Sequence, residues 1–105
     1  MSKVVRYFHL RPFGKPTKGG ATVRVTGDTN ILGQVDVQVA FCSRKDGFCK
    51  KIGREEAGKK VIKVVPLRYL PEELAGIMVD VGYKTHLPFE IPDYTYAIKY
   101  FLPKE

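Results

Sequence analysis

Basic side chains gather between residues 42 and 60, where they could hold an anion. The candidates for this chemistry are Arg44, Lys45, Lys50, Lys51, Arg54, Lys59 and Lys60, joined by Lys15 and Lys18 upstream. Guanidinium and ammonium groups donate hydrogen bonds to phosphate oxygens, and an array of them attracts polyanions. We therefore predict that these residues bind nucleic acid or a phosphorylated nucleotide. The alternative is a helix face whose cations contact only solvent.

The net charge of +7 is spread unevenly along the 105 residues. Residues 1–24 carry +6 and residues 44–70 carry another +6, whereas residues 25–43 carry −2 and residues 71–105 carry −3. This asymmetry predicts one basic face and one neutral to acidic face. A basic face attracts nucleic acid, nucleotides or an acidic protein surface.

Side chains that could catalyse a reaction or bind a metal are few. Cys42, Cys49, His9 and His86 are the only thiols and imidazoles, and their spacing does not match the four-ligand zinc sites of proteins. The common phosphate-loop, dinucleotide, zinc-protease and serine-hydrolase motifs are absent from the sequence. We expect no enzymatic activity, no metal and no cofactor.

Length and hydropathy predict a single domain over residues 1–105. The sequence holds no apolar run of the roughly 18–20 residues that a membrane span needs, and its start lacks the apolar core of a secretory signal. We therefore expect a cytoplasmic protein without a membrane partner.

The basic residues must be positioned by elements predicted in the order β-β-β-α-β-α-β. The strands are expected at 3–11, 21–29, 34–42, 60–67 and 94–101, and the helices at 43–58 and 71–83. Apolar and polar residues alternate in the second and third strands, which predicts an antiparallel meander. Asp36, Gln38 and Ala40 share its second face, which we expect to contact water. The prediction is an α+β fold with a mainly antiparallel sheet and two short helices.

The predicted helix at 43–58 would present most of the cations. Ser43 and Asp46 match the S-x-x-D pattern that marks a helix start. The side expected to pack on the sheet holds Phe48, Cys49, Ile52 and Gly53. Gly53 would let the helix approach the sheet closely, whereas Arg54 fits either an ion pair or a bidentate phosphate contact.

Aromatic side chains flank the basic stretch at both ends of the chain. They are Tyr7, Phe8 and Phe13 near the start, and Tyr94, Tyr96 and Tyr100 on one side of the predicted strand 94–101. Exposed rings could stack on the bases of a nucleic acid. The alternative is that these rings are core or edge-strand residues, which we favour for the three tyrosines of 94–101.

The stretch from Cys42 to Lys59 resembles a segment of small, uncharacterised proteins encoded by tailed bacteriophages. The shared pattern is Cys-Ser-x-Lys-Asp-x-Phe-x-(Arg/Lys)-Lys-x-Gly-Arg-x-x-Ala, and residues 19–23 followed by two strands are similar too. The resemblance covers roughly residues 19–60. It implies a binding protein that acts in the cytoplasm of a bacterial host cell and interferes with a host process, by counter-defence or takeover.

Two other functions remain open at this point. The chain could be a protein–protein inhibitor that blocks an acidic groove on a host enzyme. It could also be a structural or assembly protein, a homo-oligomer in which strand 94–101 pairs with a second copy of itself.

Overall fold

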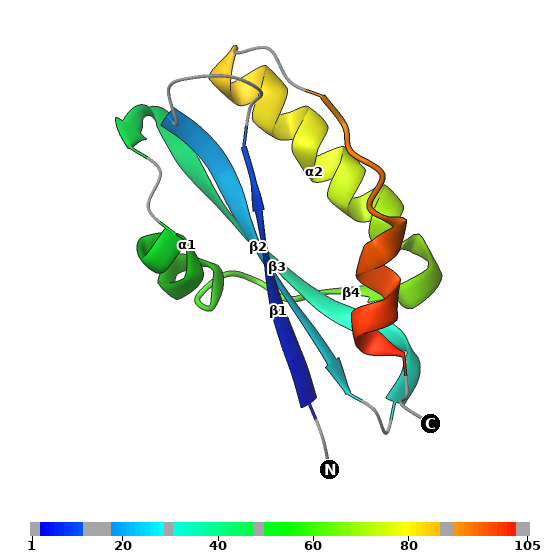
Figure 1. Ribbon diagram of the computed structural model, residues 1–105. Coiled ribbons are helices and arrows are strands. Elements are labelled where there is room, and N and C mark those ends of the chain that lie inside the picture. Colours follow the sequence, from blue (N-terminus) through cyan, green and yellow to red (C-terminus); the bar gives the residue numbers. More distant parts are fainter. Residues whose placement is uncertain (1–2, 12–17, 29–30, 48–49, 87–89, 103–105) are drawn as a thin grey trace.

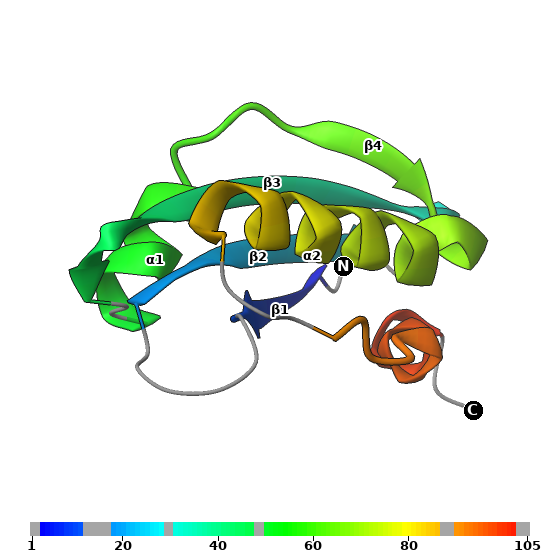
Figure 2. The ribbon, with the colours of Figure 1, turned by 90° about the horizontal axis from the view of Figure 1, so that it is seen from above.

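The sheet contains its strands in the order in which they occur in the sequence. The computed structural model describes residues 3–11, 18–28, 31–47, 50–86 and 90–102. Within them, β1 (Lys3–Leu10), β2 (Lys18–Asp28), β3 (Ile31–Gly47) and β4 (Lys63–Pro66) form an antiparallel sheet of order β1-β2-β3-β4 (Figure 2). The α+β class and the predicted meander are confirmed.

Helices cover the two faces of this sheet unequally. Helix α2 (Leu70–Thr85) and the 3₁₀ helix η2 (Thr95–Phe101) lie over one face, and the shorter helix α1 (Lys50–Ala57) lies on the other (Figure 1). The 3₁₀ turn η1 (Leu67–Tyr69) leads from β4 into α2. The main core lies under α2, where the helix buries Leu74, Ile77, Met78 and Val81 against the valines of β2 and β3. The prediction of a helix at 71–83 with this apolar stripe is confirmed.

The helix predicted at 43–58 begins later than expected. β3 continues as a strand to Gly47, where it pairs with Lys18 of β2, and α1 begins at Lys50. Ser43 and Asp46 therefore do not cap a helix, and Arg44 and Lys45 lie in a strand. The physical reason is that the stretch is held on β2 at both ends, by pairing of Cys42 with Gly20 and of Gly47 with Lys18. This backbone pairing outweighs one side-chain cap.

Two glycines at the start of β2 let this strand pair with the end of β3. Gly19 has a φ of 79° and Gly20 a φ of 136°, a region that residues with a Cβ rarely adopt. The β2–β3 register shifts between Lys18 and Gly20. This irregularity lets β2 continue to Lys18 and keep contact with the end of β3.

The second face of the meander is not exposed to water, contrary to the prediction. Gln38 and Ala40 are buried, and so is Thr22 of β2. Helix α1 covers this area, with Ala57 buried and Gly53 directly over Thr22. A Cβ on Gly53 would overlap Thr22 Oγ1, so the predicted close approach of helix and sheet at Gly53 is confirmed.

The side of α1 that packs on the sheet is narrower than predicted. Ile52, expected in the core, is exposed. Phe48 and Cys49 lie outside the described residues. The small residues Gly53 and Ala57, one turn apart, form the contact instead, because only they let the helix backbone come this close to β2.

Where a strand was predicted at 94–101, residues 95–101 form the 3₁₀ helix η2. Ala97 and Phe101 point into the core at helical spacing. Gly27 of β2 leaves room for the Phe101 ring, since a Cβ there would lie 2.6 Å from Phe101 Cδ1. The aromatic alternation suggested a strand, but burial of Phe101 against a distant glycine favours the helix. The predicted self-association through a strand at 94–101 is therefore wrong.

Candidate nucleic-acid interface

The structure describes some of the cations that the sequence singled out. Lys51, Arg54, Lys59 and Lys60 are exposed, and Lys59 Nζ lies 3.6 Å from Glu56 Oε1. Lys15 lies outside the described residues. The backbone alone is described for Lys18, Arg44, Lys45 and Lys50. Arg54 lies in the last turn of α1.

The backbone brings two of the predicted basic segments to one end of the sheet. Lys18 is the Cα partner of Gly47, and Gly20 is the partner of Cys42. The start of β2 and the last residues of β3 are therefore neighbours, although 24 to 29 residues separate Lys18 from residues 42–47 in the sequence. The two basic stretches predicted to form one positive field are adjacent at this point.

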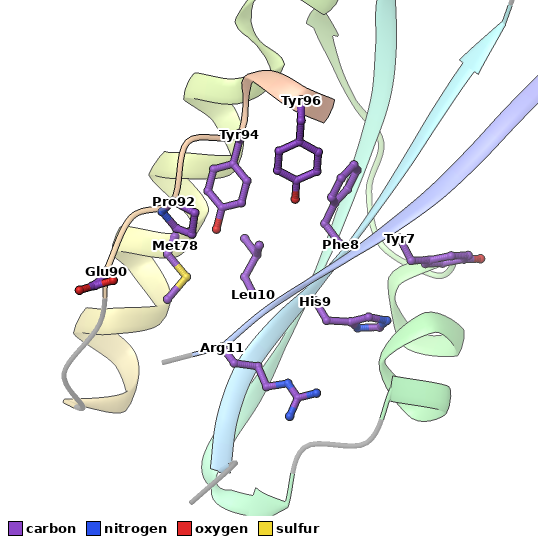
Figure 3. A pocket seen from close by; sticks show the side chains of 10 residues that line it. All are labelled: Tyr7, Phe8, His9, Leu10, Arg11, Met78, Glu90, Pro92, Tyr94 and Tyr96. Carbon is purple, nitrogen blue, oxygen red and sulfur yellow. The ribbon is translucent and has the colours of Figure 1, made fainter. Parts of the chain in front are cut away.

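The outer edge of β1 adjoins a cavity of about 390 Å³. β1 is the first strand of the sheet, and five consecutive residues, 7–11, line the cavity. Figure 3 shows Tyr7, His9 and Arg11 pointing to one side of β1, and Phe8 and Leu10 to the other. This follows from the two-residue repeat of a strand. We call this cavity with its lining the β1 groove.

The opposite wall of the β1 groove comes from the segment before η2 and from its first turn. Tyr94 and Tyr96 lie across from Phe8 (Figure 3). The centroids of the Phe8 and Tyr96 rings are 6.4 Å apart, as are those of Tyr94 and Tyr96. Phe8 and Tyr94 are buried, which agrees with the alternative that the rings are core residues. Tyr7 and Tyr96 are exposed.

Cations accompany these rings along β1. Arg11 lines the groove. Beyond Tyr96, the guanidinium carbon of Arg6 lies 4.7 Å from the centroid of the Tyr100 ring and Lys99 Nζ lies 5.7 Å from it. Arg6, Arg11 and Lys99 were not among the predicted cations, because they are scattered along the chain. In a strand over residues 3–11, side chains alternate between the two sides. This alternation was the one signal that could have placed Arg11 on the same side as Tyr7.

The β1 groove and helix α1 are linked through Thr22. His9 Nδ1 lies 3.1 Å from Thr22 Oγ1, and Gly53 of α1 lies on that same threonine. Arg54 follows Gly53 directly in the chain. The basic helix therefore adjoins the face of β1 that carries Tyr7, His9 and Arg11. This face carries one exposed ring, Tyr7, beside cations that can bind phosphates, whereas Tyr96 lies across from Phe8 on the other side of β1.

The start of η2 is held by a local hydrogen bond. The backbone N–H of Thr95 donates to Asp93 Oδ1 at 3.0 Å, and this bond, with a contribution from the Thr95 side chain, lowers the pKa of Asp93 below its ordinary value. The contact spans two residues, as in an Asx turn, and so orients the chain just before Tyr96 enters the groove.

The Tyr94 phenol makes the stability of the fold depend on pH. Burial, with a smaller effect from Tyr96, raises the pKa of Tyr94 from 10.0 to about 12. The folded protein thus favours the neutral phenol, so the stability contributed by Tyr94 is complete below pH 10 and is lost as the pH rises through 12. Tyr94→Phe cannot ionise, and we expect its melting temperature to fall less than that of the wild type over this interval.

Thermal melts at several pH values measure this difference. Tyr83→Phe is the control, since Tyr83 is exposed on α2 and its substitution should leave the wild-type profile unchanged. Parallel loss of stability in the wild type and Tyr94→Phe would contradict the assignment.

Within the described residues, no three His, Cys, Asp or Glu side chains gather where they could hold a metal ion. Helices of the length and apolarity required to cross a membrane do not occur in that part of the chain. Comparison with protein-family models, curated proteins and solved structures gave no match to this chain.

Proposed function

We propose that the protein binds single-stranded nucleic acid along the β1 groove. The observation that carries the proposal is that two exposed rings flank the same stretch of β1: Tyr96 lies across the groove from Phe8, and Tyr7 extends with Arg11 from the other side of the strand. Every nucleotide presents a flat base and a negatively charged phosphate. Aromatic rings bind the first and basic side chains the second.

The position of the rings favours a single strand over a duplex. A base can reach Tyr7 or Tyr96 only if it leaves its stack, which costs little in a single strand. The flanking cations would follow the phosphates, with Arg6 and Lys99 at the Tyr100 end of the groove and Arg11 at the other. Lys51 and Arg54 on α1 add to the positive field.

Removal of one stacking ring tests the site directly. A labelled oligonucleotide of about ten residues, as oligo(dT) or oligo(U), should bind with an affinity measured by fluorescence anisotropy. Because stacking contributes about 1–3 kcal/mol per base, Tyr96→Ala should weaken binding about 5- to 150-fold. Tyr69→Ala is the matched control: the exposed fractions of Tyr69 and Tyr96 are 44% and 45%, and Tyr69 lies beside β4. Equal losses in both variants would contradict the site.

A charge substitution tests the phosphate contact in the same assay. Arg11→Gln and Arg68→Gln each remove one positive charge, but Arg68 lies near Tyr69 and away from the groove. We expect Arg11→Gln alone to reduce the slope of log affinity against log salt by about 0.7, the value for one phosphate contact on a single strand. An affinity that is constant between roughly 50 and 200 mM salt would overturn the proposal.

Two further ligands identify what the groove binds. A duplex of the same sequence should bind more weakly than the single strand, and a mononucleotide should compete only weakly, since it offers one base and few phosphates. Tight binding of the mononucleotide alone would assign the groove to a phosphorylated nucleotide instead. The resemblance to phage proteins is the only support for proposing that this binding interferes with a host process.

A further inference from the structure

Tyr94 brings a hydroxyl group into the wall of the β1 groove. The residue is only 5% exposed, and Figure 3 shows its ring pointing with the hydroxyl toward Leu10. Among the described residues, none forms a hydrogen bond with this hydroxyl. Buried polar side chains are normally hydrogen-bonded, so an exception in the wall of a cavity points to a bound ligand.

The Tyr94 hydroxyl is open to the cavity. In the described part of the chain, Thr26 Oγ1 is the only fully enclosed side-chain oxygen or nitrogen without a partner. Since the Tyr94 hydroxyl has no partner among these residues either, it must be in contact with the cavity of about 390 Å³ that its ring lines. A ligand that enters the groove can therefore reach it.

The lining around this hydroxyl is largely apolar. Leu10 and Met78 are buried, and Pro92 and the ring of Tyr96 lie beside Tyr94 in the same lining. The cavity volume is near the lower end of the range of small-ligand pockets, about 300–1,000 Å³. Apolar walls and an aromatic ring beside a hydroxyl fit a flat heteroaromatic ring with a polar atom on its edge, which is the chemistry of a nucleobase.

The Tyr94 phenol is suited to donate its proton to a carbonyl oxygen. Because burial raises the pKa of Tyr94 to about 12, the hydroxyl keeps its proton at neutral pH. Carbonyl oxygens project from the rings of uracil and thymine, whereas the group that projects from adenine is an amino donor. A carbonyl accepts the phenol proton, but an amino group in the same place would leave that proton without an acceptor.

We propose that the β1 groove holds one uracil or thymine base, with a carbonyl oxygen of the base accepting a hydrogen bond from the Tyr94 hydroxyl. This inference rests on the proposed function and makes Tyr94 the residue that determines the base preference. Tyr96 stacks on the base, and a ring can stack on any base. The hydroxyl discriminates, because a site built around a hydrogen bond disfavours a ligand that cannot form it.

Tyr94→Phe removes the hydroxyl and keeps the ring. Anisotropy titrations compare this variant with the wild type on oligo(dA) and on the tighter-binding of oligo(dT) and oligo(U), which also identifies the strand as DNA or RNA. We expect affinity for the pyrimidine strand to fall about fivefold or more, because a buried carbonyl loses its partner, and affinity for oligo(dA) to change less than about twofold. Each strand is compared with itself, so the stacking of adenines on one another cancels.

Tyr83→Phe is the matched control, since Tyr83 is 73% exposed and does not line the groove. It should leave both affinities unchanged. The melting temperature of Tyr94→Phe at neutral pH should match that of the wild type, because no hydrogen bond to a described residue is lost.

Three outcomes would overturn the base contact: equal losses on both strands in Tyr94→Phe, a loss on neither, or a loss on oligo(dA) alone. Tyr96→Ala separates these outcomes from failure of the proposed function. If Tyr96→Ala still weakens binding while Tyr94→Phe shows one of the three, nucleic-acid binding in the groove stands and only the role of Tyr94 is wrong. A wild type that binds none of the oligonucleotides would overturn both.

Discussion

Gly53→Ala is expected to lower the free energy of unfolding by about 1–3 kcal/mol, the usual cost of overpacking a tight contact. The added Cβ would overlap Thr22 Oγ1. Thr22 cannot move aside freely, because it is buried and its hydroxyl lies 3.1 Å from His9 Nδ1. This loss exceeds the gain in helix propensity, which by itself favours alanine by about 1 kcal/mol. Urea denaturation monitored by circular dichroism measures the difference.

Gly76→Ala is the matched control for this prediction. Gly76 is exposed in the middle of α2, and a Cβ there would meet nothing within 4 Å. We expect this variant to gain about 0.5–1 kcal/mol, since only helix propensity changes. Thr22→Ala in the Gly53→Ala background should recover part of the loss by removing the overlapping hydroxyl. If both glycine variants shift stability in the same direction, the contact between α1 and β2 is not as close as described.

Gln38→Glu is expected to destabilise the fold by about 3 kcal/mol at neutral pH. The buried amide of Gln38 donates from Nε2 to the carbonyls of Gly58 at 3.3 Å and Lys60 at 2.9 Å, while its Oε1 accepts from Arg24 Nη1 at 2.7 Å. A carboxylate keeps the contact with Arg24 but turns an oxygen toward both carbonyls. The segment that leaves α1 would then lose its attachment to the sheet.

The loss in Gln38→Glu should diminish as the pH falls, because a protonated carboxyl can again donate to one of the carbonyls. Gln34→Glu makes the same chemical change at an exposed position on the same face of β3, and its stability should remain within about 0.5 kcal/mol of the wild type. Hydrogen exchange at Val61 and Ile62 should accelerate only in the Gln38 variant. Equal stability of the two variants would show that the carbonyl contacts contribute little.

The residues of the candidate interface could be predicted only in part. Phe8 and Tyr96 were both named as aromatic candidates from the sequence, but their proximity was not predicted, because they belong to segments almost ninety residues apart. Arg6 and Arg11 were not among the predicted cations, because most of the predicted ones cluster in residues 44–60. A groove between one strand edge and the chain end has no local signature, since it arises from the docking of one element against another.

By itself, the sequence determined the antiparallel meander, helix α2 with its buried stripe and the close approach at Gly53. Each of these depends on a short-range period or on the size of one side chain. The tertiary structure decided the rest. Residues 42–47 extend β3 because their two ends, Cys42 and Gly47, pair with β2. Residues 95–101 form a 3₁₀ helix because the Phe101 ring finds space above Gly27. Local preference was outweighed in both cases by backbone pairing or burial against residues far away in the chain.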